Sequence, residues 1–454
     1  MNITPMTGGL IVSVAMLPTV VLAHSTEVNP TMTPTQSAQA LYELINAALH
    51  QDQGRQQYQA QSNAMREMGI ASATLMDPKL KMGVGGLPVD SFKFDDDPMT
   101  NISVGLMQQF ERGSTTTLKE KQANQQADGM VLQAENRERE IASNITQIWL
   151  ELGYLQLAQR TLENTQKLLI EQEKFVQTNY GIGKSEAQDL LNAQLNVSQY
   201  DEKLHTNRQM QQRLRSQLSE WLGEQWLSNQ SQFEASNQLP WSQLDNYLTT
   251  SLDSTSHFDA LTQHPMVKMA DATIAANETQ VELAEQAYTP QFGVEVMYAY
   301  RQADNMRGEP ASDLLSAYVT MDIPLFTGNR QDRNLSAAQY QVGAVRSGRD
   351  VLLAQMNAKA NALINDRINL TERIERYQST LLPQSIARTE AVERGYQNNT
   401  AQFGDVISAS ITELTLTLEY QRLVTDLSLV NNNLAALLVG YEYSVEPVQA
   451  QPAK

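Results

Sequence analysis

The alternating stretch Pro290–Arg301, PQFGVEVMYAYR, constrains the fold of this chain more than any other segment. Apolar residues alternate along it with residues that are mostly polar or small, and this period of two predicts a β-strand with one apolar face. The sequence on both sides is helical in pattern and rich in Gln, Asn, Ala and Leu, so it offers no β-domain to cover that face. We therefore expect the strand to find partners in other copies of the chain, within a membrane-spanning barrel.

Residues 1–23 are predicted to form a secretory signal peptide. The apolar run Leu10–Leu22 is too short for an ordinary transmembrane helix, and small residues precede a predicted cleavage before His24. An uncleaved anchor is the alternative, because the segment before the apolar run carries no positive side chain. No other stretch approaches about 18 consecutive apolar residues, so we expect no transmembrane helix in the mature chain.

Composition excludes several classes of protein. The chain has 454 residues and a net charge of −18, which argues against a nucleic-acid partner because such a partner needs a basic face. It contains no cysteine, so disulfides, zinc–thiolate sites and a lipidated cysteine are excluded. Only 41% of the residues are hydrophobic, which suits long solvated helices better than one large core.

An internal duplication divides the mature sequence into two repeats. Residues 179–193 align without gaps on the segment from 395, an offset of 216 that pairs Asp189 with Asp405. Upstream, residues 77–80 match 289–292 at an offset of 212. We assign the four extra residues of the second repeat to a longer hairpin loop.

Each repeat is predicted to contain a helix, a β-hairpin and a pair of long helices. The first repeat (24–221) comprises a helix at Gln36–Met68, a hairpin at 79–110 with strands Lys79–Leu87 and Thr100–Phe110, and a helix pair at 116–221. Apolar residues in the long helices recur at alternate spacings of four and three, the period of coiled-coil packing.

The second repeat (264–440) follows the same plan. It comprises a helix at Pro265–Ala287, a hairpin at 291–326 with strands Gln291–Arg301 and Ala317–Phe326, and a helix pair at 328–440. We expect Pro383 to kink the first of these helices rather than end it. An irregular, equatorial region (222–263) lies between the repeats, and residues 441–454 are predicted to be a flexible tail.

Four amphipathic strands cannot close a barrel alone, because an open edge in lipid leaves backbone groups without hydrogen bonds. Three chains would supply twelve strands around a water-filled lumen, and a ring of their helices would form a hollow cylinder. Two or four chains also satisfy this arithmetic. The alternation predicts the lumen-facing residues Glu295 and Asp322, and the lipid-facing residues Phe292, Val294, Val296, Val319 and Ile323.

The chain resembles the TolC family of outer-membrane efflux proteins over essentially its whole mature length. The resemblance rests on the duplicated plan and on the segments YGIGKSEAQDLLNAQ (180–194), YQNNTAQFGDVISAS (396–410) and PLFTGNRQ (324–331). It implies a homotrimer with an outer-membrane barrel and a long periplasmic α-helical tunnel, docked through its tip onto an adaptor (membrane fusion) protein and an inner-membrane RND pump. The first hairpin, with GVGGLPVDSF (83–92) before an acidic loop, is similar to members that serve heavy-metal efflux.

The resemblance also implies a gate at the periplasmic tip. By position, Asp405 matches an aspartate that lines the entrance, and Asp189 and Tyr396 match members of a closing polar network. This chain departs from the pattern at Ala401, where the best-known member has an arginine, and at Ser408, where it has a second ring aspartate. One ring of Asp405 carboxylates is therefore implied. From the residues alone, Asp405 is equally explained as the N-cap of a helix.

No catalytic, metal or cofactor site is predicted. The sequence shows no nucleophile with a nearby base, no phosphate loop and no metal-ligand cluster, so we predict a protein that is not an enzyme. The predicted function is the exit duct of a tripartite efflux system, carrying heavy-metal cations in particular to the outside. Multidrug or type I protein export by the same fold is an alternative. A periplasmic helical scaffold without a pore is the rival from another class, and it would not need the four alternating strands.

Overall fold

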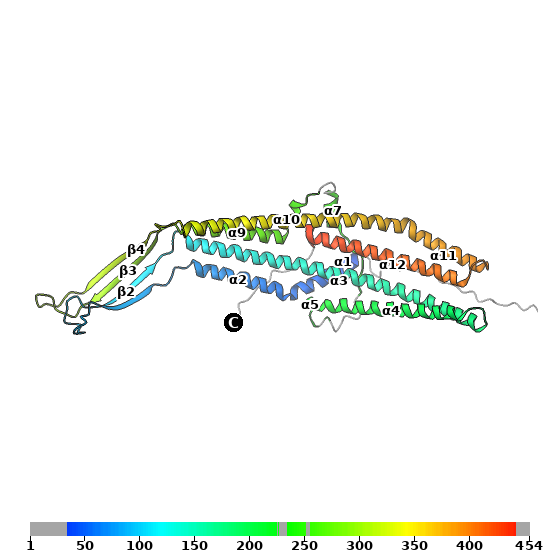
Figure 1. Ribbon diagram of the computed structural model, residues 1–454, viewed down its shortest axis with the longest axis horizontal. Helices are drawn as coiled ribbons and strands as arrows, with labels where there is room; N and C mark the ends of the chain where they lie inside the picture. The colour runs from blue at the N-terminus through cyan, green and yellow to red at the C-terminus, as the bar shows by residue number, and fades with distance from the viewer. Residues whose placement is uncertain (1–33, 225, 227–233, 251–254, 442–454) are drawn as a thin grey trace, which may run out of the picture.

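The computed structural model describes residues 34–224, 226, 234–250 and 255–441. The molecule is a long rod with a β-sheet at one end and the turns of two helical hairpins at the other (Figure 1). The predicted signal peptide and all but the first residue of the predicted tail lie outside the described residues. None of the helices within the described ranges combines the length and the hydropathy that a transmembrane helix requires.

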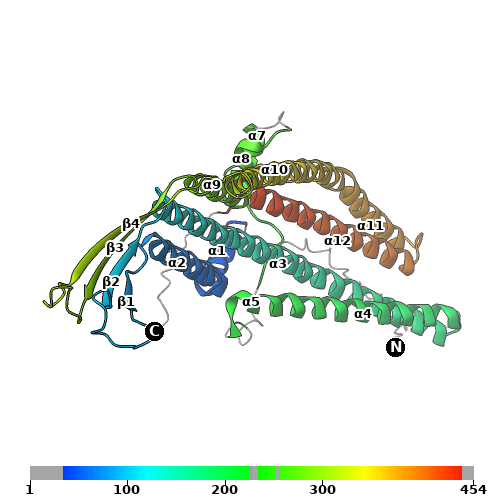
Figure 2. The same cartoon turned by 60° about the vertical axis from the view of Figure 1, so that its left-hand side comes forward.

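Four strands form one antiparallel sheet in the order β1-β2-β3-β4. Their bounds are β1 Lys79–Gly85, β2 Asn101–Gln109, β3 Gln291–Tyr300 and β4 Leu314–Asp322. The two predicted hairpins are joined along β2 and β3, which pair from Ile102 with Tyr300 to Gln109 with Gly293. β1 and β4 are the two free edges of the sheet, and the strands are bowed (Figure 2).

The last strand differs from its prediction, Ala317–Phe326. β4 begins and ends earlier, so Ile323 lies in the segment between β4 and the next helix. The loop 301–313 is shorter than the loop 86–100, so the prediction of a longer second hairpin loop was wrong. Three of the four extra residues follow β4, where Pro324 has no backbone N–H to continue the ladder.

The opening helix predicted at Gln36–Met68 is in fact two helices, α1 Pro34–Gln51 and α2 Gln53–Ala73. Asp52 separates them and caps α2, because its carboxylate accepts a hydrogen bond of 2.8 Å from the backbone N–H of Arg55. The long pair of the first repeat follows as α3 Thr115–Gly181 and α4 Ala187–Gln217, with the short α5 Ser219–Leu222 after it.

The second repeat has a matching set of helices. They are α9 Pro265–Gln286, α10 Gln331–Arg376, the π-turn η2 Tyr377–Leu381, α11 Leu382–Gln397, α12 Phe403–Leu434 and the π-turn η3 Ala435–Val439. α10, η2 and α11 form one continuous rod as long as α3, which has 67 residues. This rod and α12 begin 216 residues after α3 and α4. Pro383 lies just after the π-turn, where the rod bends without ending, as predicted (Figure 2).

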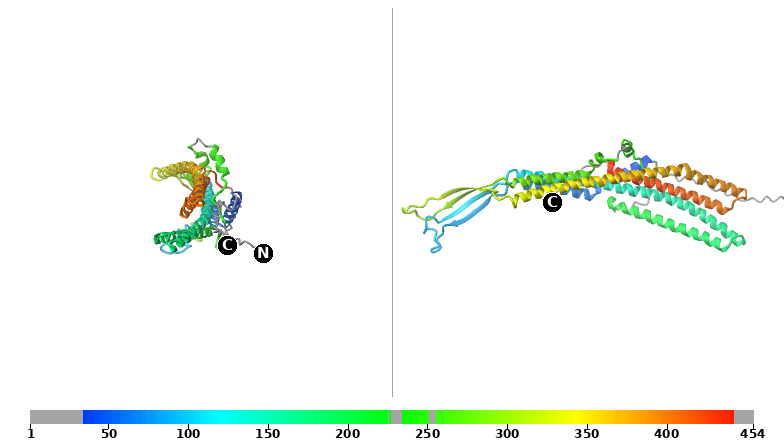
Figure 3. Two further views of the ribbon diagram at one scale, coloured as in Figure 1. Left: turned by 90° about the vertical axis from the view of Figure 1, so that its right-hand side faces the viewer. Right: turned by 45° about the horizontal axis from the view of Figure 1, so that its top comes forward.

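The segment predicted to be irregular between the repeats includes, among its described residues, the short helices α7 Ser242–Thr250 and α8 Phe258–Leu261. Two hydrophobic cores lie nearby, one around α1 and α3 with Ile141 and Trp149 fully buried, and one around α8, α9, α10 and η3. α3 packs against both α4 and α12, and α9 packs against both α3 and α10. Viewed down the long axis, the helices form a curved wall (Figure 3).

Candidate functional site: the strand wall and the helical tip

One face of the sheet is apolar and exposed. Strand register places Phe292, Val294, Val296 and Val319 on this face, each at least 40% exposed. Ile323, predicted to lie with them, follows the end of β4 and is 49% exposed. The same face carries the exposed side chains Leu80, Met82, Val84, Ile102, Val104, Leu106, Tyr298, Tyr300, Leu315 and Met321. Proteins surrounded by water bury such side chains, so this face requires an apolar environment.

The opposite face of the sheet is mostly polar or small. Glu295 lies on it and is only 8% exposed, and its Oε2 atom lies 2.6 Å from Nζ of Lys81. Lys81 is on β1 and Glu295 on β3, so this ion pair crosses β2 beside Gly105, which has no side chain. The same face carries Gly83, Gly85, Asn101, Ser103, Met107, Gly293, Met297, Ala299, Leu314, Ser316, Tyr318 and Thr320.

Asp322, the second residue predicted for the lumen, shares this face at the helical end of β4. It forms an ion pair with Arg112, which lies between β2 and α3 and donates a hydrogen bond of 2.8 Å to the backbone carbonyl of Thr289. The contact joins the two repeats where the sheet meets the helices. Both carboxylates predicted for the lumen are therefore paired with a basic side chain.

The two predicted gate aspartates occupy equivalent positions at the far end of the rod. Asp189 Oδ2 accepts a hydrogen bond of 3.1 Å from the N–H of Glu186, and Asp405 Oδ2 accepts one of 3.0 Å from the N–H of Gln402. Each aspartate completes a capping box at the start of its own helix, and both side chains are exposed. Asp405 is thus the third helical residue, and the N-cap is Gln402.

Tyr396, the third predicted gate residue, lies against an aromatic side chain. Its ring centroid is 5.9 Å from that of Phe403, which in turn is 4.6 Å from that of Phe175. Phe175 is on α3 and Phe403 on α12, so the cluster links the two helical hairpins near the tip. The sequence predicted a polar network around Tyr396 and not this aromatic contact, although Phe403 lies within the aligned tip segment.

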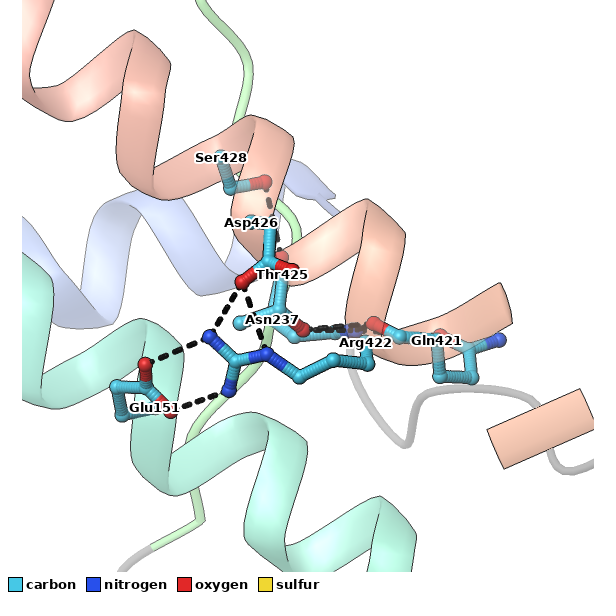
Figure 4. Close-up of polar contacts among 7 residues, drawn as sticks. All are labelled: Glu151, Asn237, Gln421, Arg422, Thr425, Asp426 and Ser428. Atoms are coloured by element: carbon cyan, nitrogen blue, oxygen red, sulfur yellow. Dashed lines mark hydrogen bonds and ion pairs between the residues drawn. The ribbon is translucent and has the colours of Figure 1, made fainter. Parts of the chain in front are cut away.

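A polar cluster fastens α3 to α12 at the middle of the rod (Figure 4). Arg422 donates two hydrogen bonds to Glu151, of 2.7 and 2.9 Å, and these bonds raise the pKa of Arg422. Arg422 also bonds Asp426 on its own helix at 2.8 Å. Beside this pair, the carbonyl of Asn237 accepts a hydrogen bond of 3.0 Å from Ser428, which attaches the connecting segment to α12. Sequence reasoning did not find this cluster.

The described part of the chain presents extended surfaces. Within the described ranges, no group of three or more His, Asp or Glu side chains is placed to hold a metal ion. A cavity of about 480 Å³ lies beside α1 and is lined by Tyr42, Trp241 and Tyr441 among others, none of them charged. What the molecule does present is a sheet with one apolar and one polar face, continued by a curved helical wall.

Comparison with solved structures identifies this arrangement. The outer membrane protein VceC from Vibrio cholerae is 15% identical, with a TM-score of 0.70 over 90% of this chain and 99% of that one. The Campylobacter jejuni outer membrane channel CmeC is 10% identical, with a TM-score of 0.68 over 92% and 90%. CusC, described for folding and transmembrane channel formation, is 14% identical, with a TM-score of 0.67 over 88% and 92%.

The likeness is one of fold. No protein-family model and no curated protein sequence matches the chain. The solved structures nevertheless cover 88–92% of this chain. The chain therefore has the TolC-like fold of outer-membrane channels that its sequence predicts, with two structural repeats and four strands per protomer.

Proposed function

We propose that this chain is the outer-membrane exit duct of a tripartite efflux system and that it works as a homotrimer. One observation carries the proposal: the sheet exposes its apolar face, whereas Glu295 is buried on the polar face. A sheet in water would have the opposite arrangement. Such a duct conducts passively, so it needs neither a catalytic residue nor a cofactor.

The apolar face suits the hydrocarbon region of the outer membrane. β3 has 10 residues and β4 has 9, the length of a tilted transmembrane strand. Exposed aromatic side chains flank the band, with Phe110 near its helical end and Tyr300 near its loop end. Aromatic belts are typical of membrane interfaces. We therefore propose lipid contact for Phe292, Val294, Val296, Val319 and Ile323.

The free edges β1 and β4 favour a closed assembly. Neighbouring strands alternate in direction, so β4 of one copy can pair antiparallel with β1 of the next and leave no edge unpaired. Three copies would close a barrel of twelve strands, wide enough for a water-filled lumen. Glu295 and Asp322 would then face that lumen.

The helical wall would continue the lumen as a periplasmic tunnel. We propose that its tip binds the adaptor protein and, through it, the inner-membrane RND pump. Exposed apolar side chains at the end of the first hairpin, Ile182, Leu191 and Leu195, provide a surface for such a contact. Three copies of Asp405 would form a ring that attracts cations, and Asp189 and Tyr396 would hold the ends of the hairpins that surround it.

Heavy-metal cations are the substrate class that we propose. Support comes from the resemblance of residues 83–92 to members of heavy-metal systems and from the implied ring of Asp405. Export of drugs or of proteins by the same fold is the second candidate. A deletion strain tested side by side against copper, silver, zinc, cobalt and common antibiotics separates them. Sensitivity to metals alone supports our proposal, and sensitivity to antibiotics alone contradicts it.

The absence of cysteine from the sequence permits a direct test of the two faces. Val296→Cys places a single thiol on the apolar face of β3, and Ser316→Cys places one on the polar face of β4. In trimers reconstituted into lipid vesicles, we expect a charged, membrane-impermeant maleimide to label Ser316→Cys alone. An uncharged maleimide that partitions into lipid should label Val296→Cys. A chain that stays soluble without detergent, and labels equally at both positions, would indicate the periplasmic scaffold instead.

A further inference from the structure

The ion pair between Lys81 and Glu295 lies on the polar face of the sheet. Lys81 Nζ lies 2.6 Å from Glu295 Oε2; the Glu295 side chain is 10% exposed and that of Lys81 49%. In the other ion pair of the sheet, at its helical end, the carboxylate is the exposed partner, with the Asp322 side chain 67% exposed and Arg112 20%. Lys81 and Glu295 thus hold each other near the middle of the wall.

The local sequence leaves room for this pair. Strands in a sheet lie about 4.8 Å apart, so β1 and β3 are about 10 Å apart and their side chains meet only above β2. The residue opposite Lys81 on β2 is Gly105. A Cβ atom there would lie 2.9 Å from the carbonyl oxygen of Val296 and 3.2 Å from Cβ of Met297, so β2 and β3 approach closely at this position. Lys81 on β1 and Glu295 on β3 can therefore form an ion pair across β2, because Gly105 has no side chain there.

Other charges on this face are few. The register assigns it Lys79 and Asp322 in addition to the pair, and Asp322 is neutralised by Arg112. Lys79 is the first residue of β1, at the helical end of the sheet and in the register row of Glu295, so it adds a positive charge beside the pair. In a closed barrel, three copies of the Lys81–Glu295 pair would form a band without net charge. Loss of either partner would leave three like charges around one lumen, where their potentials add.

We propose that the Lys81–Glu295 pair sets the charge selectivity of the barrel by keeping the middle of its lumen neutral. The inference rests on the proposed function as a membrane channel and deepens it. A neutral wall neither retains a cation that has passed the tip nor excludes the anions that accompany it. Any selection of ions by charge would then take place at the helical tip.

Single-channel recording in planar bilayers across a KCl gradient tests this proposal. Lys81→Gln leaves unpaired carboxylates, so it should raise the permeability ratio of K⁺ to Cl⁻ by roughly fivefold, and Glu295→Gln should lower it by a similar factor. The double variant Lys81→Gln with Glu295→Gln should return to the wild-type ratio. So should the exchanged pair, Lys81→Glu with Glu295→Lys. Each variant is also recorded with Asp405→Ala and with Lys79→Gln, so that neither charge at the tip nor the second lysine of this face, which lies in the register row of Glu295, masks the pair.

The inference is supported if the permeability ratio shifts in opposite directions in the two single variants and returns to the wild-type value in the double and exchanged variants. Channels whose permeability ratio stays at the wild-type value in both single variants overturn it and leave the proposed function intact. A wild-type chain that forms no pore overturns the proposed function instead. If the single variants fail to assemble as heat-resistant trimers, Ser103→Glu and Ser103→Lys on the same face replace them: opposite shifts of the ratio support the inference, and an unchanged ratio in both overturns it.

Discussion

Large apolar side chains are exposed in the sheet but buried in the middle of the helical rod. In the helical middle, Ile141, Ile145 and Trp149 have no exposed surface, whereas Met82 and Val319 in the sheet are 75% and 74% exposed. Residue type cannot explain the difference, since both regions use large apolar side chains. The surroundings explain it: the helices pack against one another in water, and the sheet requires an apolar phase outside the chain.

The charged side chains do not show this inversion. In the sheet, the Glu295 side chain is 10% exposed and that of its partner Lys81 49%. In the helical middle, the Arg422–Glu151 pair lies at the joint between two helices, with side chains 32% and 27% exposed. Ion pairs thus join neighbouring elements in both regions, and the apolar side chains alone distinguish the sheet from the helices.

Charged substitutions on the apolar face of the sheet have the largest expected effect on assembly. Val294→Arg with Val296→Arg would place two charges in lipid at about 2–4 kcal/mol each, so we expect no trimers in the outer membrane. Ser103→Arg with Ser316→Arg, on the polar face of the neighbouring strands, is the matched control and should assemble. Membrane fractionation and trimer resistance to heat on gels measure the outcome. Equal assembly of the two double variants would contradict the assigned faces.

Close packing in the helical middle gives the next effect. A Cβ atom on Gly153 of α3 would lie 2.2 Å from the carbonyl carbon of Ser236, whereas nothing lies within 4 Å of one on Gly129 of the same helix. Gly153→Ala should therefore lower the free energy of unfolding by about 1–3 kcal/mol. Gly129→Ala should raise it by about 0.5–1 kcal/mol, because alanine favours the helix. Denaturation in detergent measures both, and effects of the same sign would show that the connecting segment does not cross α3 closely.

His264 makes the stability of the helical region depend on pH. It is 6% exposed, and its Nδ1 accepts a hydrogen bond of 3.2 Å from the N–H of Met266 at the start of α9. Burial, together with the charge of Arg139, lowers the pKa of His264 to about 4. The unfolded chain has the ordinary pKa of about 6.5, so this contribution is complete above pH 6.5 and is lost as pH falls toward 4.

We expect the free energy of unfolding to be roughly 1–2 kcal/mol lower near pH 5 than near neutral pH. His264→Asn retains a capping side chain without a titrating group and should flatten this part of the profile. The sheet carries no histidine, so detergent-stable closure of the barrel should not change over the same range. A profile as steep in His264→Asn as in the wild type would assign the pH dependence to other groups.

Local signals were sufficient to predict the strands and the long helices. The alternation in Pro290–Arg301 predicted both the strand and its two faces, because side chains along a strand point to opposite sides. The offset of 216 extends even to the turns at the tip: Gly183 and Asn399 occupy equivalent positions and both have positive φ, 74° and 57°. Glycine and asparagine adopt this conformation more readily than other residues.

Contacts between distant segments could not be predicted in the same way. Lys81 and Glu295 are 214 residues apart, and nothing in either strand indicates the other partner. The predicted end of β4 was also wrong. The apolar alternation continues through Ile323, although Pro324 interrupts the hydrogen bonds of the ladder. At the helical tip, the sequence predicted the equivalent positions of Asp189 and Asp405 but not the aromatic cluster, since ring contacts depend on how two hairpins pack.

The smallest effects are expected at the tip, where the side chains of Asp189 and Asp405 are exposed. Asp189 and Asp405 complete equivalent capping boxes, so Asp189→Ala and Asp405→Ala should each cost about 1 kcal/mol or less and lower the thermal midpoint equally. Only Asp405 is proposed to line the entrance. Asp405→Ala alone should therefore reduce cation preference and block by multivalent cations in single-channel recordings. Equal changes in both variants would assign both aspartates to the lumen, and unchanged selectivity in both would leave Asp405 as a capping residue.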